Sequence, residues 1–180
     1  MTASRWNQVV DALYDKAVAL PGYRSITEPS FNETDVVVLD GPEYQLTGDT
    51  SDRFLLIGSA LDADGEPQGR AGQSLATLGP GQSRDDRGSV ICQVLVQVGS
   101  AELSLPGYTA QRDTFRVLRT AAFGVLSDLD TAIRSDVTLG VVAARMLARI
   151  GDLIIPRQYQ TDRGQAVVSV QFTVDYDTRV

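Results

Sequence analysis

The carboxy-terminal run of alternating residues constrains the fold of this 180-residue chain more than any other feature. Apolar residues occupy every second position from 168 to 176, and the positions between them are mostly polar. A period of two residues predicts a β-strand with one buried face and one more polar face. The apolar positions are Val168, Val170, Phe172, Val174 and Tyr176.

Four further stretches predict the strands that would complete a sheet. The last of them also suits a helix, but its apolar residues alternate between Gly140 and Gly151, so we expect a short strand there. The tripeptide Asp-Arg-Gly predicts a turn at 162–164 and again at 86–88, each before a strand, because glycine adopts positive φ freely. The four stretches are Val36–Leu39, Arg53–Leu61, Ser89–Val98 and Val141–Ile150.

Two segments have the three- and four-residue apolar spacing of amphipathic helices. The first covers Ser4–Leu20 and ends before Pro21-Gly22, and the second runs from about Thr109 or Gln111 to Ser135. Strands with two helices on one face make an α+β sandwich. We therefore predict a single domain over 1–180, with a mostly antiparallel sheet of four to five strands and two helices on one face. The apolar stripe of the second helix comprises Phe115, Leu118, Ala122, Leu126, Leu129 and Ile133.

The segment 62–87 differs from the rest of the chain in composition. It is rich in Gly, Asp, Gln and Ser, and it has few apolar residues. Loops of this length are usually functional arms or disordered. We expect a flexible hairpin arm inserted into the domain.

The sequence offers few groups for catalysis or metal binding. It has no histidine and a single cysteine, Cys92, so the usual general base, an internal disulfide and a cysteine zinc cluster are all excluded. We expect no catalytic residues, no metal and no cofactor. The net charge of −7 argues against a dedicated nucleic-acid binder. The longest apolar runs are too short to cross a bilayer, and the first residues lack a secretory signal, so we expect a soluble protein made in a cytoplasm.

The second helix carries a candidate docking stripe beside its apolar face. Arg112, Arg116, Arg119 and Phe123 recur at helical spacing, and arginine and phenylalanine are enriched at protein interfaces. The other interpretation is that these arginines lay their stems along the edge of the core and keep their charges in water. Arg145 and Arg149 allow the same two interpretations, on the sheet face away from the helices.

The order of elements and the carboxy-terminal hairpin together resemble the tail terminator proteins of long-tailed bacteriophages. The specific residues are Tyr159-Gln160-Thr161-Asp162-Arg163-Gly164, then Val168-x-Val170-x-Phe172-x-Val174, then Thr178-Arg179. The resemblance implies a homo-oligomeric ring, a hexamer, that caps the finished tail tube and docks to the head connector. It implies no catalytic residues, and DNA would pass through the ring without being bound.

The resemblance also implies a place in the virion, with assembly in the host cytoplasm and no membrane partner. The arm would reach a neighbouring subunit or the tail tube protein, and its candidate contact residues are Leu75, Leu78, Arg70 and Arg84. A head–tail connector or a minor tail protein is the alternative within the same machine. From other classes, a small-ligand-binding or hydrolytic domain using carboxylates and tyrosines, or a regulatory or toxin-related module, stays open.

Overall fold

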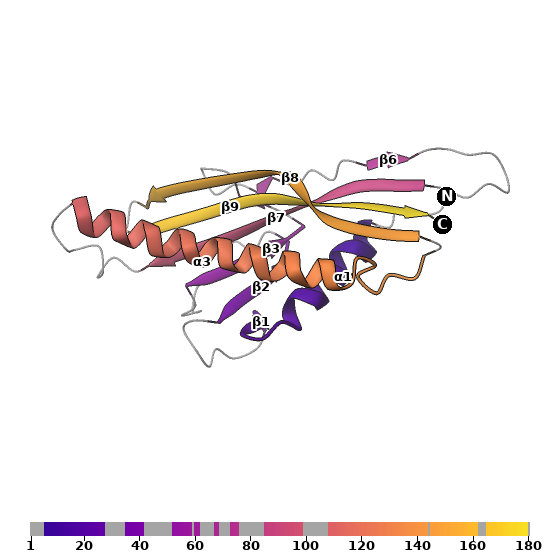
Figure 1. Ribbon diagram of the computed structural model, residues 1–180, viewed down its shortest axis with the longest axis horizontal. Helices are drawn as coiled ribbons and strands as arrows, with labels where there is room; N and C mark the ends of the chain where they lie inside the picture. The colour runs from indigo at the N-terminus through magenta and orange to yellow at the C-terminus, as the bar shows by residue number, and fades with distance from the viewer. Residues whose placement is uncertain are drawn as a thin grey trace.

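The computed structural model has an α+β fold in which two helices lie against one face of a single large sheet (Figure 1). This is the predicted fold class. The residues that the structure describes are 6–27, 35–41, 52–58, 60–61, 67–68, 73–75, 85–98, 108–143, 145–161 and 165–179.

The sheet has seven strands, more than the four to five expected, in the order β1-β2-β3-β7-β9-β8, with β6 beside the first part of β7. The count is higher because two strands have only three residues each, too few to produce an alternating pattern. A separate pair joins β4 (Ala60–Leu61) to β5 (Pro67–Gln68). The seven strands are β1 (Tyr23–Ser25), β2 (Val36–Asp40), β3 (Arg53–Ile57), β6 (Gln73–Leu75), β7 (Asp85–Val98), β8 (Arg145–Gln160) and β9 (Ala166–Arg179).

Most neighbouring strands are antiparallel, but β1, β2 and β3 run parallel to one another. The first two predicted strands therefore do not form a hairpin. In contrast, β3 and β7 are antiparallel neighbours. The described parts of the predicted arm lie in strands: 67–68 in β5, 73–75 in β6 and 85–87 at the start of β7. β9 lies between β7 and β8 and pairs with both over nearly its whole length. The alternation from Val168 to Tyr176 is confirmed, because all five apolar side chains are buried.

The main core lies between the sheet and the helices α1 (Trp6–Val18) and α3 (Tyr108–Ser135). α1 contributes Val9, Val10, Leu13 and Ala17, and these pack with β2, β3 and β7. α3 covers β7, β8 and β9. Its predicted stripe is confirmed: five of the six side chains are buried, and Phe115 packs half-buried at the edge of the core.

The strand predicted at Val141–Ile150 has different boundaries in the structure. It begins at Arg145 because a turn follows α3, with positive φ at Leu139 (51°) and Gly140 (70°). Val142 therefore lies outside the sheet and is 89% exposed. It does not end at Gly151 but continues through a register shift between Ile150 and Ile154. A Cβ atom on Gly151 would overlap the Thr173 hydroxyl, so the irregular segment needs glycine at this point.

The predicted turn at 86–88 is wrong. These residues lie inside β7 and pair with 176–178 of β9 on one side and with 73–75 of β6 on the other. Aspartate and glycine favour turns as local preferences, and here cross-strand pairing overrides them. The second predicted turn, at 162–164, lies outside the described residues.

The sheet face away from the helices is not open across its whole width. Val37, Leu39, Phe54 and Leu56 form a second buried cluster there, and Leu95 packs against it, so the prediction that part of this face is covered is confirmed. Along β8 the same face is exposed at Leu147 and at other positions. The exposed part of the sheet is therefore the β8 side.

Candidate assembly surfaces

β8 is a 16-residue strand at the edge of the sheet, and among the described strands it pairs with β9 alone. A long edge strand presents unpaired backbone groups on which another chain can add. Two features interrupt this edge: the register shift before Ile154, and Pro156, which has no N–H to donate. A partner would therefore engage mainly the side chains along β8. Three of them are large, apolar and exposed: Leu147 (43%), Ile154 (38%) and Tyr159 (40%).

The predicted stripe on α3 lies next to this edge. Arg119 Nη1 donates a hydrogen bond to Gln158 Oε1 of β8 at 2.8 Å. Ile154 and Gln158 pair with Phe172 and Val168 of β9, and paired residues share a face, so both lie on the side of the sheet that α3 covers. We call the resulting region the α3–β8 surface, which consists of Arg112, Arg116, Arg119, Phe123, Ile154 and Gln158.

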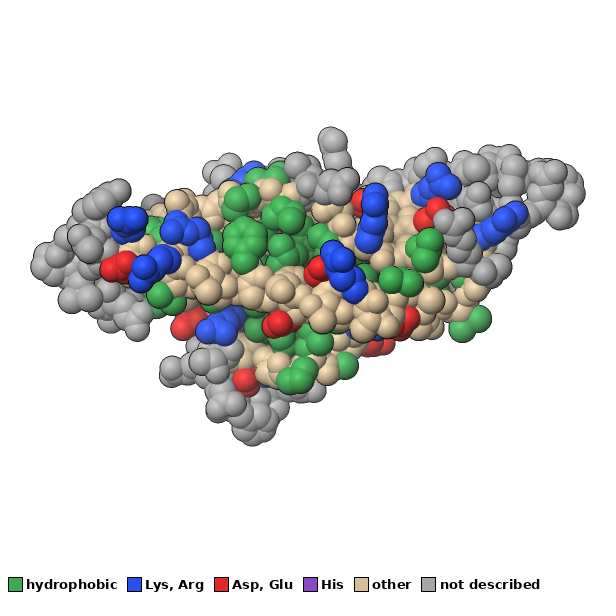
Figure 2. Space-filling view, in the orientation of Figure 1, with side chains coloured by type: hydrophobic (Ala, Val, Ile, Leu, Met, Phe, Trp, Pro, Cys, Tyr) green, Lys and Arg blue, Asp and Glu red, His purple; other side chains and the backbone are tan. Residues whose placement is uncertain are grey.

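Figure 2 shows basic side chains gathered around the first half of α3 and hydrophobic side chains between α3 and β8. Phe123 is 42% exposed, and the Arg116 side chain is 71% exposed and lies 3.5 Å from Asp113 on the same helix. Arg119, in contrast, is half-buried along β8. The packing interpretation thus describes Arg119, whereas Arg112 and Arg116 are exposed and available to a partner.

The other predicted interface residues are not part of this surface. Arg149 is exposed on the face away from the helices, where it pairs in register with Asp175. The side chains of Arg145 and Leu75 are not among those described. Arg70, Leu78 and Arg84 of the arm lie outside the described residues.

A shallow groove of about 930 Å³ crosses β7, β9 and β8 and was not anticipated from the sequence. Arg87 Nε lies 3.3 Å from Asp177 Oδ2, and Ser89 donates a hydrogen bond of 2.8 Å to Asp175 Oδ1. Both carboxylates therefore have donors from the neighbouring strand. Arg149, which also lines the groove, is the group best placed to bind an anion. The sequence placed Arg149 on this face, and the alternation of β9 predicted a more polar face there, but neither pattern indicated a groove.

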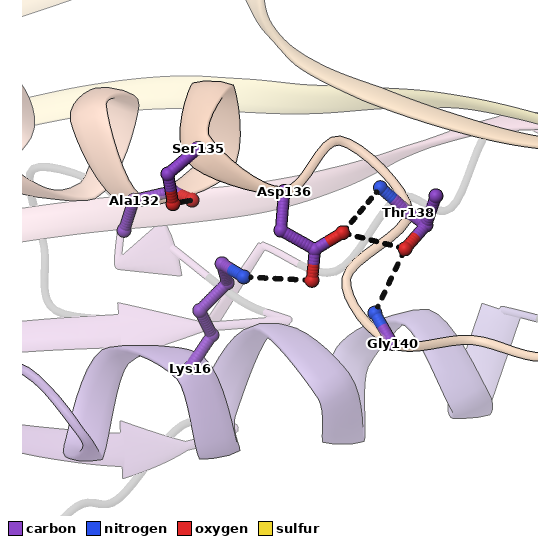
Figure 3. Close-up of polar contacts among 6 residues, drawn as sticks. All are labelled: Lys16, Ala132, Ser135, Asp136, Thr138 and Gly140. Carbon is purple, nitrogen blue, oxygen red and sulfur yellow. Dashed lines mark hydrogen bonds and ion pairs between the residues drawn. The ribbon is translucent and has the colours of Figure 1, made fainter.

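A second groove, of about 760 Å³, lies between α1 and the turn after α3. Lys16 Nζ donates to Asp136 Oδ2 at 3.0 Å and so joins the two helices (Figure 3). The other carboxylate oxygen of Asp136 accepts from the Thr138 hydroxyl at 2.5 Å and from its backbone N–H at 3.1 Å. We call this region the acidic groove, because Asp11, Asp15 and Asp136 line it and Lys16 is the one cation among its lining residues.

The polar contacts of Asp136 predict how stability depends on pH. The hydrogen bond from Thr138 and then the one from Lys16 lower the pKa of Asp136. A carboxyl whose pKa is lower in the folded chain stabilises the fold above the usual aspartate range, and this contribution is lost as the pH falls through the folded pKa. We expect wild type to exceed Asp136→Asn in unfolding free energy at neutral pH, and the difference to shrink on acidification, measured by urea denaturation at several pH values.

Thr138→Val provides the control for this prediction, because it removes the largest cause of the lowered pKa and leaves the carboxyl in place. Its difference from wild type should shrink over the same pH range. A difference between wild type and Asp136→Asn that stays constant from neutral to acid pH would contradict the assignment.

Comparison with known proteins identifies no family for this chain. A scan against protein-family models finds no match, and a search of curated proteins finds no significant one. Within the described ranges, no helix is long and apolar enough to span a membrane, and no three acidic, cysteine or histidine side chains gather as metal ligands.

Proposed function

We propose that this chain is a structural protein of a long-tailed bacteriophage virion, which caps the tail tube as a ring and joins it to the head connector. The observation that carries the proposal is the α3–β8 surface. It combines a long edge strand with exposed arginine and phenylalanine side chains, the residue types that dominate protein interfaces. The resemblance of the carboxy-terminal hairpin and of the element order to tail terminators adds independent support.

The charge of the chain fits the proposed position in the virion. A net charge of −7 favours a passage that repels phosphate, so DNA would cross the ring without being bound. The partners would then be further copies of the chain, the tail tube protein and the head connector. A head–tail connector or a minor tail protein could use the same surface. The place where the protein binds on the tail tube distinguishes these functions from a terminator.

The proposal is tested by polymerising the tail tube protein encoded by the same genome with and without this chain. We expect shorter tubes in its presence, with gold-labelled protein at one end of each tube in negative-stain images. Label along the tube walls would indicate a different tail protein. Tubes of unchanged length with no label would overturn the proposal.

The groove across β7, β9 and β8 favours a second candidate, a small-ligand-binding domain. Its volume of about 930 Å³ suits a small molecule, and Arg149 would bind an anionic group. A screen of small carboxylates and phosphates by thermal shift tests this function. Stabilisation that Arg149→Ala abolishes would support it, and the absence of any shift would exclude it.

A further inference from the structure

The two ends of α3 carry opposite charge. At its start, Arg112, Arg116 and Arg119 outnumber the single carboxylate of Asp113. Beyond its end, the acidic groove has three carboxylates and one ammonium group. Among the described side chains, the start of the longest helix is thus basic and the groove beyond its end is acidic. Arg134, in the last turn of this helix, is paired with Asp130.

The acidic groove is lined by more carboxylates than cations. Lys16 already pairs with Asp136, and the side chains of Asp11 and Asp15 form no ion pair within the described part of the chain. Partial burial and then the charge of nearby Asp11 raise the pKa of Asp40, although Asp40 is not among the residues that line the groove. A cationic partner would relieve this repulsion between like charges.

The two regions cannot meet within one copy. Arg116 and Asp136 are about 20 residues apart along and just beyond one continuous helix, which corresponds to about 30 Å at the rise of an α-helix. Figure 1 places α1 beside the last turns of α3, away from the helix start. Any pairing between these regions must therefore join two molecules.

The α3–β8 surface and the acidic groove each also have an exposed apolar residue. Phe123, 42% exposed, is the aromatic side chain of the α3–β8 surface. The acidic groove is bordered by Val142, which is 89% exposed, and also has Ala12 and Leu139 in its lining. An aromatic anchor surrounded by charged pairs is the common arrangement of an interface centre and its rim.

We infer that copies of this chain associate head to tail, with the α3–β8 surface of one copy docked into the acidic groove of the next. This inference rests on the proposed function, because it names the surfaces through which the copies of the ring meet. An interface between two different surfaces repeats at each added copy. It closes into a ring when the rotation allows closure and otherwise grows as a filament.

Charge exchange tests the interface. Arg112→Glu with Arg116→Glu, and separately Asp11→Arg with Asp15→Arg, should each raise the protein concentration needed for half-assembly about tenfold or more. Combining all four substitutions in one chain should restore assembly to about the wild-type level. Because the four side chains are exposed, the rescue separates a lost contact from a lost fold. Arg157→Glu is the control and should leave assembly unchanged, because Arg157 is exposed and its pairing with Ser169 of β9 places it on the face away from α3.

Cysteine crosslinking tests the same interface where association is weak. Phe123→Cys and Val142→Cys in one chain should give a ladder of crosslinked multimers with a short bismaleimide, because each copy then has one thiol on either side of the interface. Chains with only one of these substitutions should give no ladder. The native Cys92 is fully buried, and burial raises the pKa of its thiol to about 12, so it should not react in the folded protein.

The outcomes separate this inference from the proposed function. Rings or capped tubes that withstand both pairs of charge reversals, or that Arg157→Glu abolishes, would overturn the interface and leave the function standing. Filaments or a crosslinked ladder that never cap a tail tube would support the interface and contradict the function. A chain with neither rescue nor ladder would overturn the inference.

Discussion

Replacing Phe172 with alanine is expected to lower the free energy of unfolding by about 3 to 5 kcal/mol, the usual effect of removing a buried phenylalanine. Phe172 is 1% exposed, and it lies on β9 between Cys92 of β7 and Ile154 of β8. Phe172 is paired on both sides, with Cys92 and with Ile154, so the cavity cannot close without moving these strands. Urea denaturation measures the loss at a protein concentration where light scattering gives the monomer mass.

Phe123→Ala is the matched control, because it removes the same side chain from an exposed position on α3. We expect it to change the unfolding free energy of the monomer by less than about 1 kcal/mol and to weaken assembly instead. A loss of stability similar to that of Phe172→Ala would contradict the placement of Phe123 on the surface.

Gly88→Ala is expected to destabilise the protein by about 1 to 3 kcal/mol through overpacking. A Cβ atom at this position would lie 2.7 Å from the Tyr176 hydroxyl oxygen and 2.8 Å and 2.9 Å from two ring carbons. The Tyr176 ring is buried at 4% exposure, so it has little room to move away from β7. Urea denaturation of the monomer again provides the measurement.

Gly124→Ala is the control, and it is expected to raise the free energy of unfolding rather than lower it. Gly124 is exposed in the interior of α3, and a Cβ atom there meets nothing within 4 Å. Since alanine favours helices more than glycine does, we expect a gain of about 0.5 to 1 kcal/mol. If Gly88→Ala raised the free energy of unfolding by a similar amount, the close packing of Tyr176 against Gly88 would be wrong.

The elements that the sequence predicted well are those whose own residues carry a complete periodic pattern. β9 alternates over five apolar positions, and α3 has an apolar stripe along nearly its full length. The three-residue strands β1 and β6 contain no period, and only their neighbours define them. The start of β8 was misplaced because Val142 continues the alternation, although the turn at Leu139 and Gly140 excludes it from the sheet.

The candidate surfaces also have a part that was predictable from the sequence and a part that was not. The arginine stripe on α3 was predictable, because helical spacing alone places Arg112, Arg116 and Phe123 on one side. Its continuation onto β8 through Gln158, and the acidic groove between Lys16 and Asp136, depend on residues far apart in the chain. No local pattern indicates contacts between Lys16 and a residue 120 positions away.

The mass of the wild-type protein in solution is the most direct test of the claim that the chain works by assembling with its own copies. We expect light scattering at low salt to rise with protein concentration towards a closed species of about six times 19.4 kDa, with rings in negative-stain images of the same sample. Added salt should dissociate it, because the exposed charges are screened. A mass that stays at 19.4 kDa at all concentrations, with and without tail tubes, would contradict the account.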